Sequence, residues 1–247
     1  MRTIEHIAHL RREGELLADA AAEAGEHAVV PTCPGWTAGD LVRHTSTFHR
    51  WAARIVGERL PGPVPEDPMP AEPVGEALLP WFLEGHGGLV RTLLAAGRET
   101  ECWTFLPAPS PVAFWARRQA HETAVHRVDA ESARGGTLSA FDPAFAADGI
   151  DELLTGFHAR PRSRVRTGRP RVLRVRPADA DAVWTVRLSA DAPPRTERNA
   201  DGPADCELAG PAQDLYLMLW NRLPLDAVPL TGDAGLAALW RESSAIT

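Results

Sequence analysis

One segment of the sequence carries the side chains best suited to chemistry, namely Glu122, His126 and Asp129. In an α-helix, positions 122 and 126 lie one turn apart at about 40° to each other, and position 129 lies within about 20° of position 122. One helix face would therefore present a carboxylate, an imidazole and a second carboxylate. A carboxylate and a histidine at this spacing can bind one divalent ion in a helical bundle, provided that another helix supplies a further ligand.

His44 is the candidate for that further ligand. It lies one position from an apolar stripe that includes Leu41, Thr45 and Phe48, so we expect it to face inward. Two histidines and one carboxylate leave the fourth position of a zinc ion open, which is typical of catalytic zinc.

The spacing also leaves plainer interpretations open. His44 alone could be a core histidine, and Glu122 with His126 could be a surface pair worth only ~0.2–0.5 kcal/mol. His121 and His126 are five residues apart, so this segment does not contain the H-E-x-x-H zinc motif.

The elements that would position these residues are helices, because apolar residues recur at spacings of three and four up to residue 158. The predicted helices cover residues 4–24, 38–56, 74–96, 112–133 and 143–157. Thr37 is the expected N-cap of the second helix, with Asp40 at its third position. Pro80 is expected to kink the third helix, and the proline-rich stretch 61–73 is expected to be a surface loop.

The pattern changes beyond residue 158, where apolar and polar residues alternate in short runs. Strands are expected near residues 173–176, 184–188 and 205–208, and helices at 211–221 and 234–242. Residues 160–176 hold eight arginines and no acidic residue, with Asp205 and Glu207 as candidate cross-strand partners. The sequence therefore predicts an α+β protein of two domains, a helical bundle at 1–158 and a small α+β domain at 159–247.

Composition excludes several classes of function. The formal net charge of -7 argues against a nucleic-acid-binding protein, and no apolar run is long enough to span a membrane. The three cysteines, Cys33, Cys102 and Cys206, form no C-x-x-C pair, so neither a disulfide framework nor a thiolate zinc site is predicted. We expect a cytoplasmic protein, since the first residues lack the apolar region of a signal peptide.

Four segments in order along the chain carry a resemblance to a known family. They are PTCPGWT at 31–37, DLVRH at 40–44, HETAVHRVDA at 121–130 and DLYLMLWNR at 214–222. Together they resemble the mycothiol-dependent maleylpyruvate isomerase family of actinobacteria. The resemblance implies a DinB-like four-helix bundle with a small α+β C-terminal domain, and one zinc ion, or another divalent metal, on His44, Glu122 and His126.

The resemblance also implies an activity. The thiolate of metal-bound mycothiol would add to a small electrophile, in a cis–trans isomerisation or an S-transfer. The protein would act as a monomer or a homodimer. The enolate formed needs a cationic partner, and Arg222 is the candidate because it falls seven residues after Leu215, at the end of the predicted helix. Arg222 could instead cap that helix. The alternative to an enzyme is a non-catalytic metal- or thiol-binding sensor or partner protein with the same fold.

Mainly structural roles are expected for the remaining residues near the candidate ligands. Trp36 is expected to pack the start of its helix, and His49 and Asp129 are candidate hydrogen-bond partners of the ligands, although His49 could equally lie at the surface. Cys33 is expected to have no ligand or redox role. Three arginines that neighbour the ligands in sequence are expected to point to other faces of their helices. They are Arg43, Arg118 and Arg127. Arg222 is therefore expected to complete a pocket between the two domains.

Overall fold

The computed structural model describes residues 1–64, 72–97, 99–200 and 202–246, and the fold is α+β as predicted. It divides into two compact units, Met1–Ser139 and Ala140–Thr247. The first unit is helical and the second contains the β-sheet. The division therefore comes earlier in the chain than the boundary expected at residue 158.

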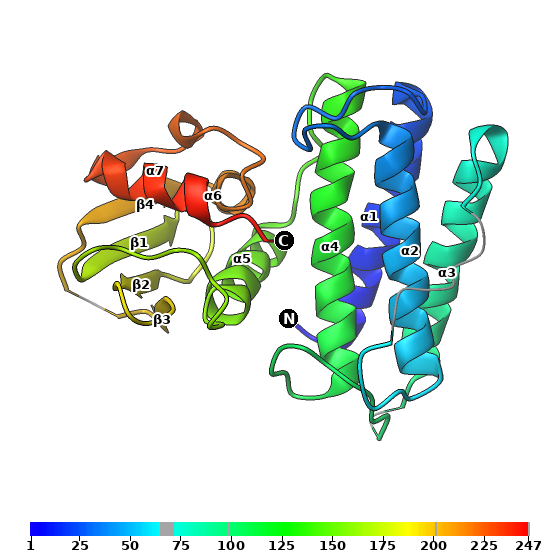
Figure 1. Ribbon diagram of the computed structural model, residues 1–247, viewed down its shortest axis with the longest axis horizontal. Helices are drawn as coiled ribbons and strands as arrows, with labels where there is room; N and C mark the ends of the chain where they lie inside the picture. The colour runs from blue at the N-terminus through cyan, green and yellow to red at the C-terminus, as the bar shows by residue number, and fades with distance from the viewer. Residues whose placement is uncertain (65–71, 98, 201, 247) are drawn as a thin grey trace. The chain divides into compact units, whose positions relative to one another are not determined.

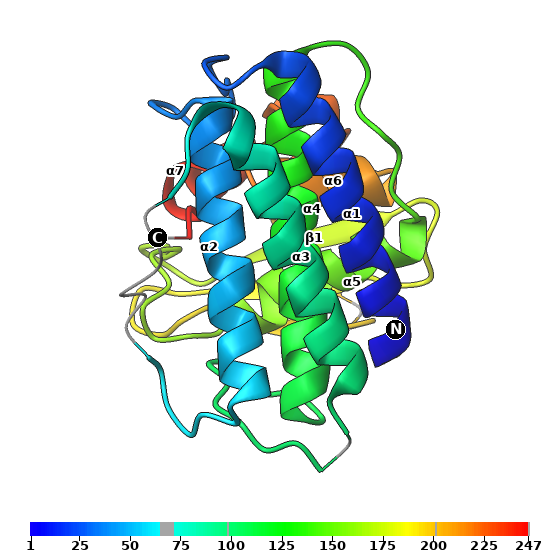
Figure 2. The same cartoon turned by 90° about the vertical axis from the view of Figure 1, so that its right-hand side faces the viewer.

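The first unit is a bundle of four helices that lie side by side in both views (Figures 1 and 2). These are α1 (Thr3–Ala24), α2 (Ala38–Gly57), α3 (Leu78–Ala95), which follows a short 3-10 turn, η1 (Gly75–Ala77), and α4 (Pro111–Arg134). Their apolar faces meet in a core whose fully buried members include Leu10, Leu17, Leu41, Ile55 and Leu89. The helices lie close to the predicted ranges, because the period of the apolar residues sets their buried faces.

Local sequence sets the helix ends near the candidate ligands. Asp40 N donates to Thr37 Oγ1 over 3.2 Å, and Thr37 N donates to Asp40 Oδ2 over 2.9 Å, which is the predicted cap of α2. Helix α3 begins at Leu78, so Pro80 lies in its first turn, where a backbone N–H has no partner within the helix. The predicted kink at Pro80 is therefore wrong. Most of the predicted loop at 61–73 lies outside the described residues.

A buried ion-pair network joins α1 to α4. The Arg127 guanidinium donates to Glu13 over 2.8 Å and to Glu131 over 2.6 Å, and all three side chains are at most 1% exposed. Ser139 N also donates to Glu131 over 3.0 Å, so the network ties the last residue of this unit to α4. Each of these charges depends on its partners, since an unpaired charge in such a position is costly.

The second unit contains a five-stranded sheet in the order β3-β2-β1-β4-β5. Its strands are β1 (Arg171–Pro177), β2 (Trp184–Leu188), β3 (Arg195–Arg198), β4 (Cys206–Gly210) and β5 (Leu230–Gly232). The pair β1 and β4 is parallel and the other pairs are antiparallel. The helical elements are α5 (Pro143–Asp151), the π-helical segment η2 (Glu152–Phe157), α6 (Ala212–Leu219), the 3-10 turn η3 (Leu225–Ala227) and α7 (Ala234–Ser243).

Contacts with the sheet explain why α5 belongs to the second unit. Asp151 Oδ1 accepts hydrogen bonds from Trp184 Nε1 over 3.0 Å and from Arg198 Nε over 2.6 Å. Thr196 Oγ1 donates to the carbonyl of Leu154 over 3.1 Å. The segment that the sequence assigned to the helical domain therefore packs against strands β2 and β3.

The arginines of strand β1 pair with Asp205 and Glu207, as predicted. Glu207 of β4 lies 3.6 Å from Arg174 and 3.1 Å from Arg176, and Val172 N donates to Asp205 over 2.6 Å. The basic stripe is thus part of a cross-strand charge pattern.

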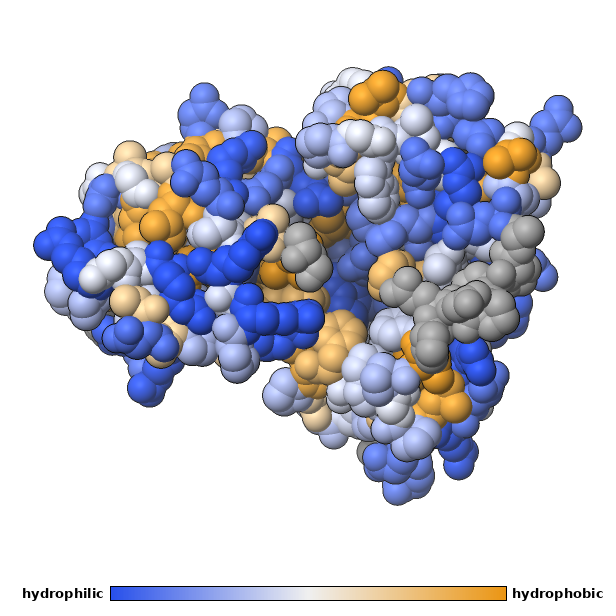
Figure 3. Space-filling view, in the orientation of Figure 1, coloured by the Kyte–Doolittle hydropathy of each residue, from blue (hydrophilic) through white to orange (hydrophobic). Residues whose placement is uncertain are grey.

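The described surface is mixed in character. In each unit, Figure 3 shows apolar residues in small separate patches among hydrophilic ones. Among the described residues, no helix has both the length and the hydropathy that crossing a membrane requires.

Candidate metal centre

Three candidate ligands converge between helices α2 and α4. One ligand atom each from His44, Glu122 and His126 lies within 4.8 Å of the others. Glu122 Oε1 is 3.2 Å from His126 Nε2 and 3.7 Å from His44 Nε2. The two residues of α4 share one face because they are four positions apart, and α2 presents His44 to that face.

These separations fit a tetrahedral ion. Ligand atoms that each lie about 2.0–2.2 Å from a tetrahedral zinc are roughly 3.3–3.6 Å from one another. The separations of 3.2 and 3.7 Å bracket that range. The side chains of Glu122 and His44 are 24% and 29% exposed, so the group is reachable from solvent while His126 lies deeper. Two imidazoles, a carboxylate and access from solvent match the donor set of a catalytic zinc site.

Hydrogen bonds orient two of the ligands. Asp129, a fully buried residue, has Oδ2 2.9 Å from His126 Nδ1, which turns Nε2 toward Glu122. Arg118 Nη2 donates to Glu122 Oε2 over 3.2 Å and leaves Oε1 for the histidines. The expectation that Arg118 points to another face is wrong, because its long side chain reaches along the helix to the residue four positions on.

Electrostatics at the site favour a cation. Burial alone would raise the pKa of Glu122, but hydrogen bonds with His126 and His44 and the charge of Arg118 hold it well below the usual range. Burial would lower the pKa of His126, but Asp129 and Glu122 outweigh it and raise that pKa to about 9. Both shifts arise because the carboxylates stabilise positive charge beside them. A divalent ion bound here would take the place of the proton on His126 Nε2.

Aromatic side chains surround the ligand rings. Trp36 packs edge-on against His44, with ring centroids 4.8 Å apart, and is stacked on His126 at 6.3 Å. Phe48 lies 4.6 Å from the ring of His44. Trp36 therefore contacts both candidate histidine ligands, and the sequence did not predict these contacts. Its position just before α2 was predicted.

The other histidines and Cys33 have different positions. His49 is fully buried and pairs with Thr123 Oγ1 over 2.8 Å, so it is neither a surface residue nor a partner of a ligand ring. His121 points away from the candidate ligands, and its ring packs 6.0 Å from that of His6 on α1. Cys33 Sγ donates to Asp129 over 3.3 Å, so it contacts the hydrogen-bond partner of a candidate ligand. That Cys33 has no ligand or redox role stays a prediction.

Arg222 lies beyond the helix that was expected to carry it. Helix α6 ends at Leu219, and Asn221 has a left-handed backbone with φ of 62°. Arg222 Nη1 donates to the carbonyl of Trp220 over 2.9 Å. The position of Arg222 is therefore set by the turn after α6. Its spacing of seven residues from Leu215 does not place it on the same helix face, because the helix ends between them.

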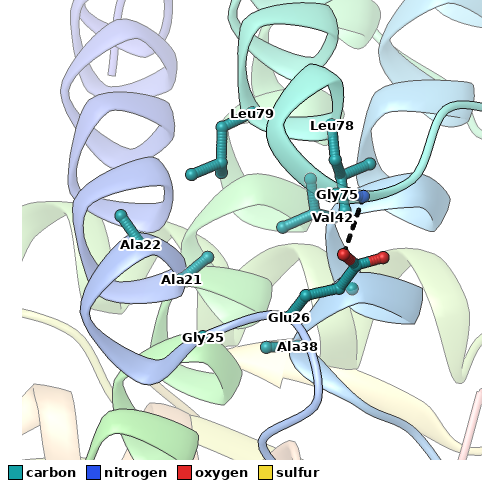
Figure 4. Close-up of a pocket in the computed structure, with 10 residues that line it drawn as sticks. Ala21, Ala22, Gly25, Glu26, Ala38, Val42, Gly75, Leu78 and Leu79 are labelled. Carbon is teal, nitrogen blue, oxygen red and sulfur yellow. Dashed lines mark hydrogen bonds between the residues drawn. The ribbon is translucent and has the colours of Figure 1, made fainter.

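A separate cavity of about 270 Å³ lies where α1, α2 and α3 meet (Figure 4). Small and apolar side chains line most of it, together with Glu26. The Glu26 carboxylate accepts hydrogen bonds from Gly75 N over 2.8 Å and from Arg43 over 3.0 Å. None of the three candidate ligands lines this cavity, and Glu26, the one carboxylate among its described lining residues, is already paired.

Comparisons with known proteins identify the family of this chain. Residues 7–131 match the family profile described as mycothiol maleylpyruvate isomerase N-terminal domain, and residues 144–239 match the corresponding C-terminal domain. The chain belongs to this family. No curated protein sequence matches the chain.

Two solved structures of mycothiol-dependent maleylpyruvate isomerase are similar in fold to this family member. A histidine-to-alanine mutant has a TM-score of 0.64 at 13% identity, over 94% of this chain and 93% of that one. A second structure of that name has a TM-score of 0.61 at 12% identity with the same coverage. In this maleylpyruvate isomerase family member, His44, Glu122 and His126 fall in the N-terminal match and Arg222 falls in the C-terminal match.

Proposed function

We propose that this protein is a zinc- and mycothiol-dependent enzyme that isomerises maleylpyruvate or a related small electrophile. The observation that carries the proposal is the convergence of His44, Glu122 and His126 at separations that suit one ion, in a chain of this family. The similar solved structures are named for mycothiol and maleylpyruvate, which supports the same cofactor and class of substrate here.

Bound zinc with an open position would supply a Lewis acid that lowers the pKa of a thiol from its free value of about 8.5. The residues of this chain prepare the site for that role. Asp129 holds the proton of His126 Nδ1, and Arg118 holds the second oxygen of Glu122. Trp36 and Phe48 pack against the ring of His44.

The reaction class is reversible thiol addition. Mycothiol would add through its sulfur to one carbon of the cis double bond, and the proton released by the thiol, or one from solvent, would add to the neighbouring carbon. Rotation about the resulting single bond and elimination of the thiol then give the trans isomer. The thiol is regenerated, and no oxidant or reductant is consumed. An S-transferase would instead leave the sulfur in the product, so product analysis separates the two activities.

Arg222 is proposed to stabilise the negative charge that develops on the electrophile. Arg222→Met is therefore expected to lower kcat by roughly 10²–10³-fold, the range observed when one charge-stabilising donor is removed. Zinc content should not change. The matched control is Arg195→Met, since Arg195 is 79% exposed on β3. Unchanged turnover in the Arg222 variant would mean that this arginine only stabilises the turn after α6.

Zinc removal tests the function as a whole. Treatment with a chelator should abolish mycothiol-dependent isomerisation of maleylpyruvate, and added zinc should restore it. The far-UV circular dichroism should be retained, because the four-helix core is formed by buried apolar side chains. Loss of helicity together with the metal would mean a structural site. A zinc-loaded protein that shows no thiol-dependent turnover would be a metal-binding protein without this activity.

A further inference from the structure

Asp129 lies at the centre of a hydrogen-bonded group that extends beyond the candidate ligands. Its Oδ1 accepts from Thr32 Oγ1 over 2.6 Å, and its Oδ2 faces both His126 Nδ1 at 2.9 Å and Cys33 Sγ at 3.3 Å. The residue itself is 0% exposed. A buried carboxylate is an acceptor only, so every one of these contacts requires a hydrogen on the partner.

This requirement determines which nitrogen of His126 faces the proposed metal site. Because Asp129 accepts at Nδ1, that nitrogen carries a proton and Nε2 is directed to Glu122 Oε1. The ring is also held between Trp36 and His44, with centroids 6.3 and 5.0 Å away. Rotation of the ring would break the bond to Asp129 and disturb both packing contacts.

Thr32 and Cys33 extend the connection to the other ligand-bearing helix. They lie in the turn before α2, which is closed by bonds from Trp36 N to the Cys33 carbonyl and from Val30 N to the Trp36 carbonyl, each 3.0 Å. The next residue, Thr37, caps α2, and α2 carries His44. Asp129 of α4 therefore anchors the segment that sets where α2 begins.

A competing arrangement uses Cys33, His126 and Asp129 themselves as metal ligands, since their atoms also lie within 4.8 Å of one another. The distances favour hydrogen bonds. Within this set, Asp129 Oδ2 lies 2.9 Å from His126 Nδ1, which is shorter than the roughly 3.3–3.6 Å between ligands of one tetrahedral ion. The 3.3 Å from Cys33 Sγ to Asp129 Oδ2 suits either arrangement.

We propose that Asp129 is a positioning residue that presents His126 Nε2 to the metal and, through Thr32 and Cys33, fixes the start of α2 and hence the position of His44. The inference rests on the proposed function, because it concerns how the zinc ligands are held. It predicts that changes at Asp129 act on zinc affinity although Asp129 is not itself a ligand.

The test compares zinc affinity, measured by competition with a chromogenic chelator, in Asp129→Ala, Asp129→Asn and the unaltered protein. Asp129→Ala is expected to weaken zinc binding by about 100-fold, and Asp129→Asn by about tenfold because its amide oxygen still accepts from His126. A second readout is NMR of ¹⁵N-histidine-labelled, zinc-loaded protein. The His126 Nδ1 proton should exchange slowly with solvent, and it should exchange faster in both variants.

The outcomes separate this inference from the proposed function. If the unaltered protein binds no zinc, the proposed function fails before the variants are compared. If it binds zinc and either folded variant shows unaltered affinity and slow exchange of the Nδ1 proton, the positioning role of Asp129 is wrong while the metal centre stands. Cys33→Ser keeps a donor at this position, so its zinc affinity should stay near that of the unaltered protein, whereas a large loss would make Cys33 a ligand.

Discussion

Replacing Glu122 with glutamine is expected to weaken zinc binding by more than the roughly 10–100-fold that loss of an outer hydrogen bond costs. Among the described residues, Glu122 is the only carboxylate with an oxygen close to the Nε2 atoms of both His44 and His126. The substitution removes a negative charge while keeping the size of the side chain. It also leaves Arg118 beside a neutral group. Thiol-dependent turnover should be lost with the metal, as measured by chelator competition and product analysis.

A matched control uses an exposed glutamate of the same unit. Glu84 of α3 is 76% exposed and pairs only with Arg50 among the described ion pairs. Glu84→Gln should leave zinc affinity and turnover unchanged. Wild-type zinc affinity in the Glu122 variant, with the helical signal intact, would remove Glu122 from the proposed ligand set.

Replacing Arg127 with methionine should lower the free energy of unfolding of the helical unit by about 3–5 kcal/mol. The change leaves Glu13 and Glu131 with buried carboxylates that no longer face the guanidinium. Burial already raises the pKa of Glu13, and Arg127 offsets part of that increase. Urea unfolding followed by far-UV circular dichroism would measure the loss.

The exposed pair of Arg54 and Glu58 provides the comparison, since their side chains are 48% and 56% exposed. Arg54→Met is expected to change the free energy of unfolding by less than about 1 kcal/mol, because solvent screens such pairs. An equal, small effect of the two substitutions would show that the network of Arg127 contributes no more than a surface pair.

The parts of the site that follow helical periodicity could be predicted from the sequence. Glu122 and His126 share a face because of their spacing, and Thr37 with Asp40 sets the start of α2, which fixes the phase of His44. These are local rules. They need no knowledge of which helix lies beside which.

The parts that depend on side-chain reach or on distant contacts could not be predicted. Whether Arg118 points along or away from its helix depends on its rotamer, and residues 32 and 129 are joined only after the chain has folded back over 97 positions. Asn221 ends α6 early through a left-handed backbone, which the apolar pattern near Arg222 does not indicate.

Long-range contacts also decide the domain boundary and the edges of the sheet. Asp151 belongs to the second unit because Trp184 and Arg198 of the sheet bind it. Strands β3 and β5 are short and largely exposed, so they lack the buried alternation that marks β1 and β2. Their pairing partners, and not their own sequences, make them strands.

Anomalous diffraction at the zinc absorption edge, from crystals of the zinc-loaded protein, is the most direct measurement of the proposed centre. We expect one peak per chain, about 2.0–2.2 Å from His44 Nε2, His126 Nε2 and Glu122 Oε1. A peak coordinated by Cys33 and Asp129 instead, or no peak near His126 at saturating zinc, would contradict the proposed metal centre.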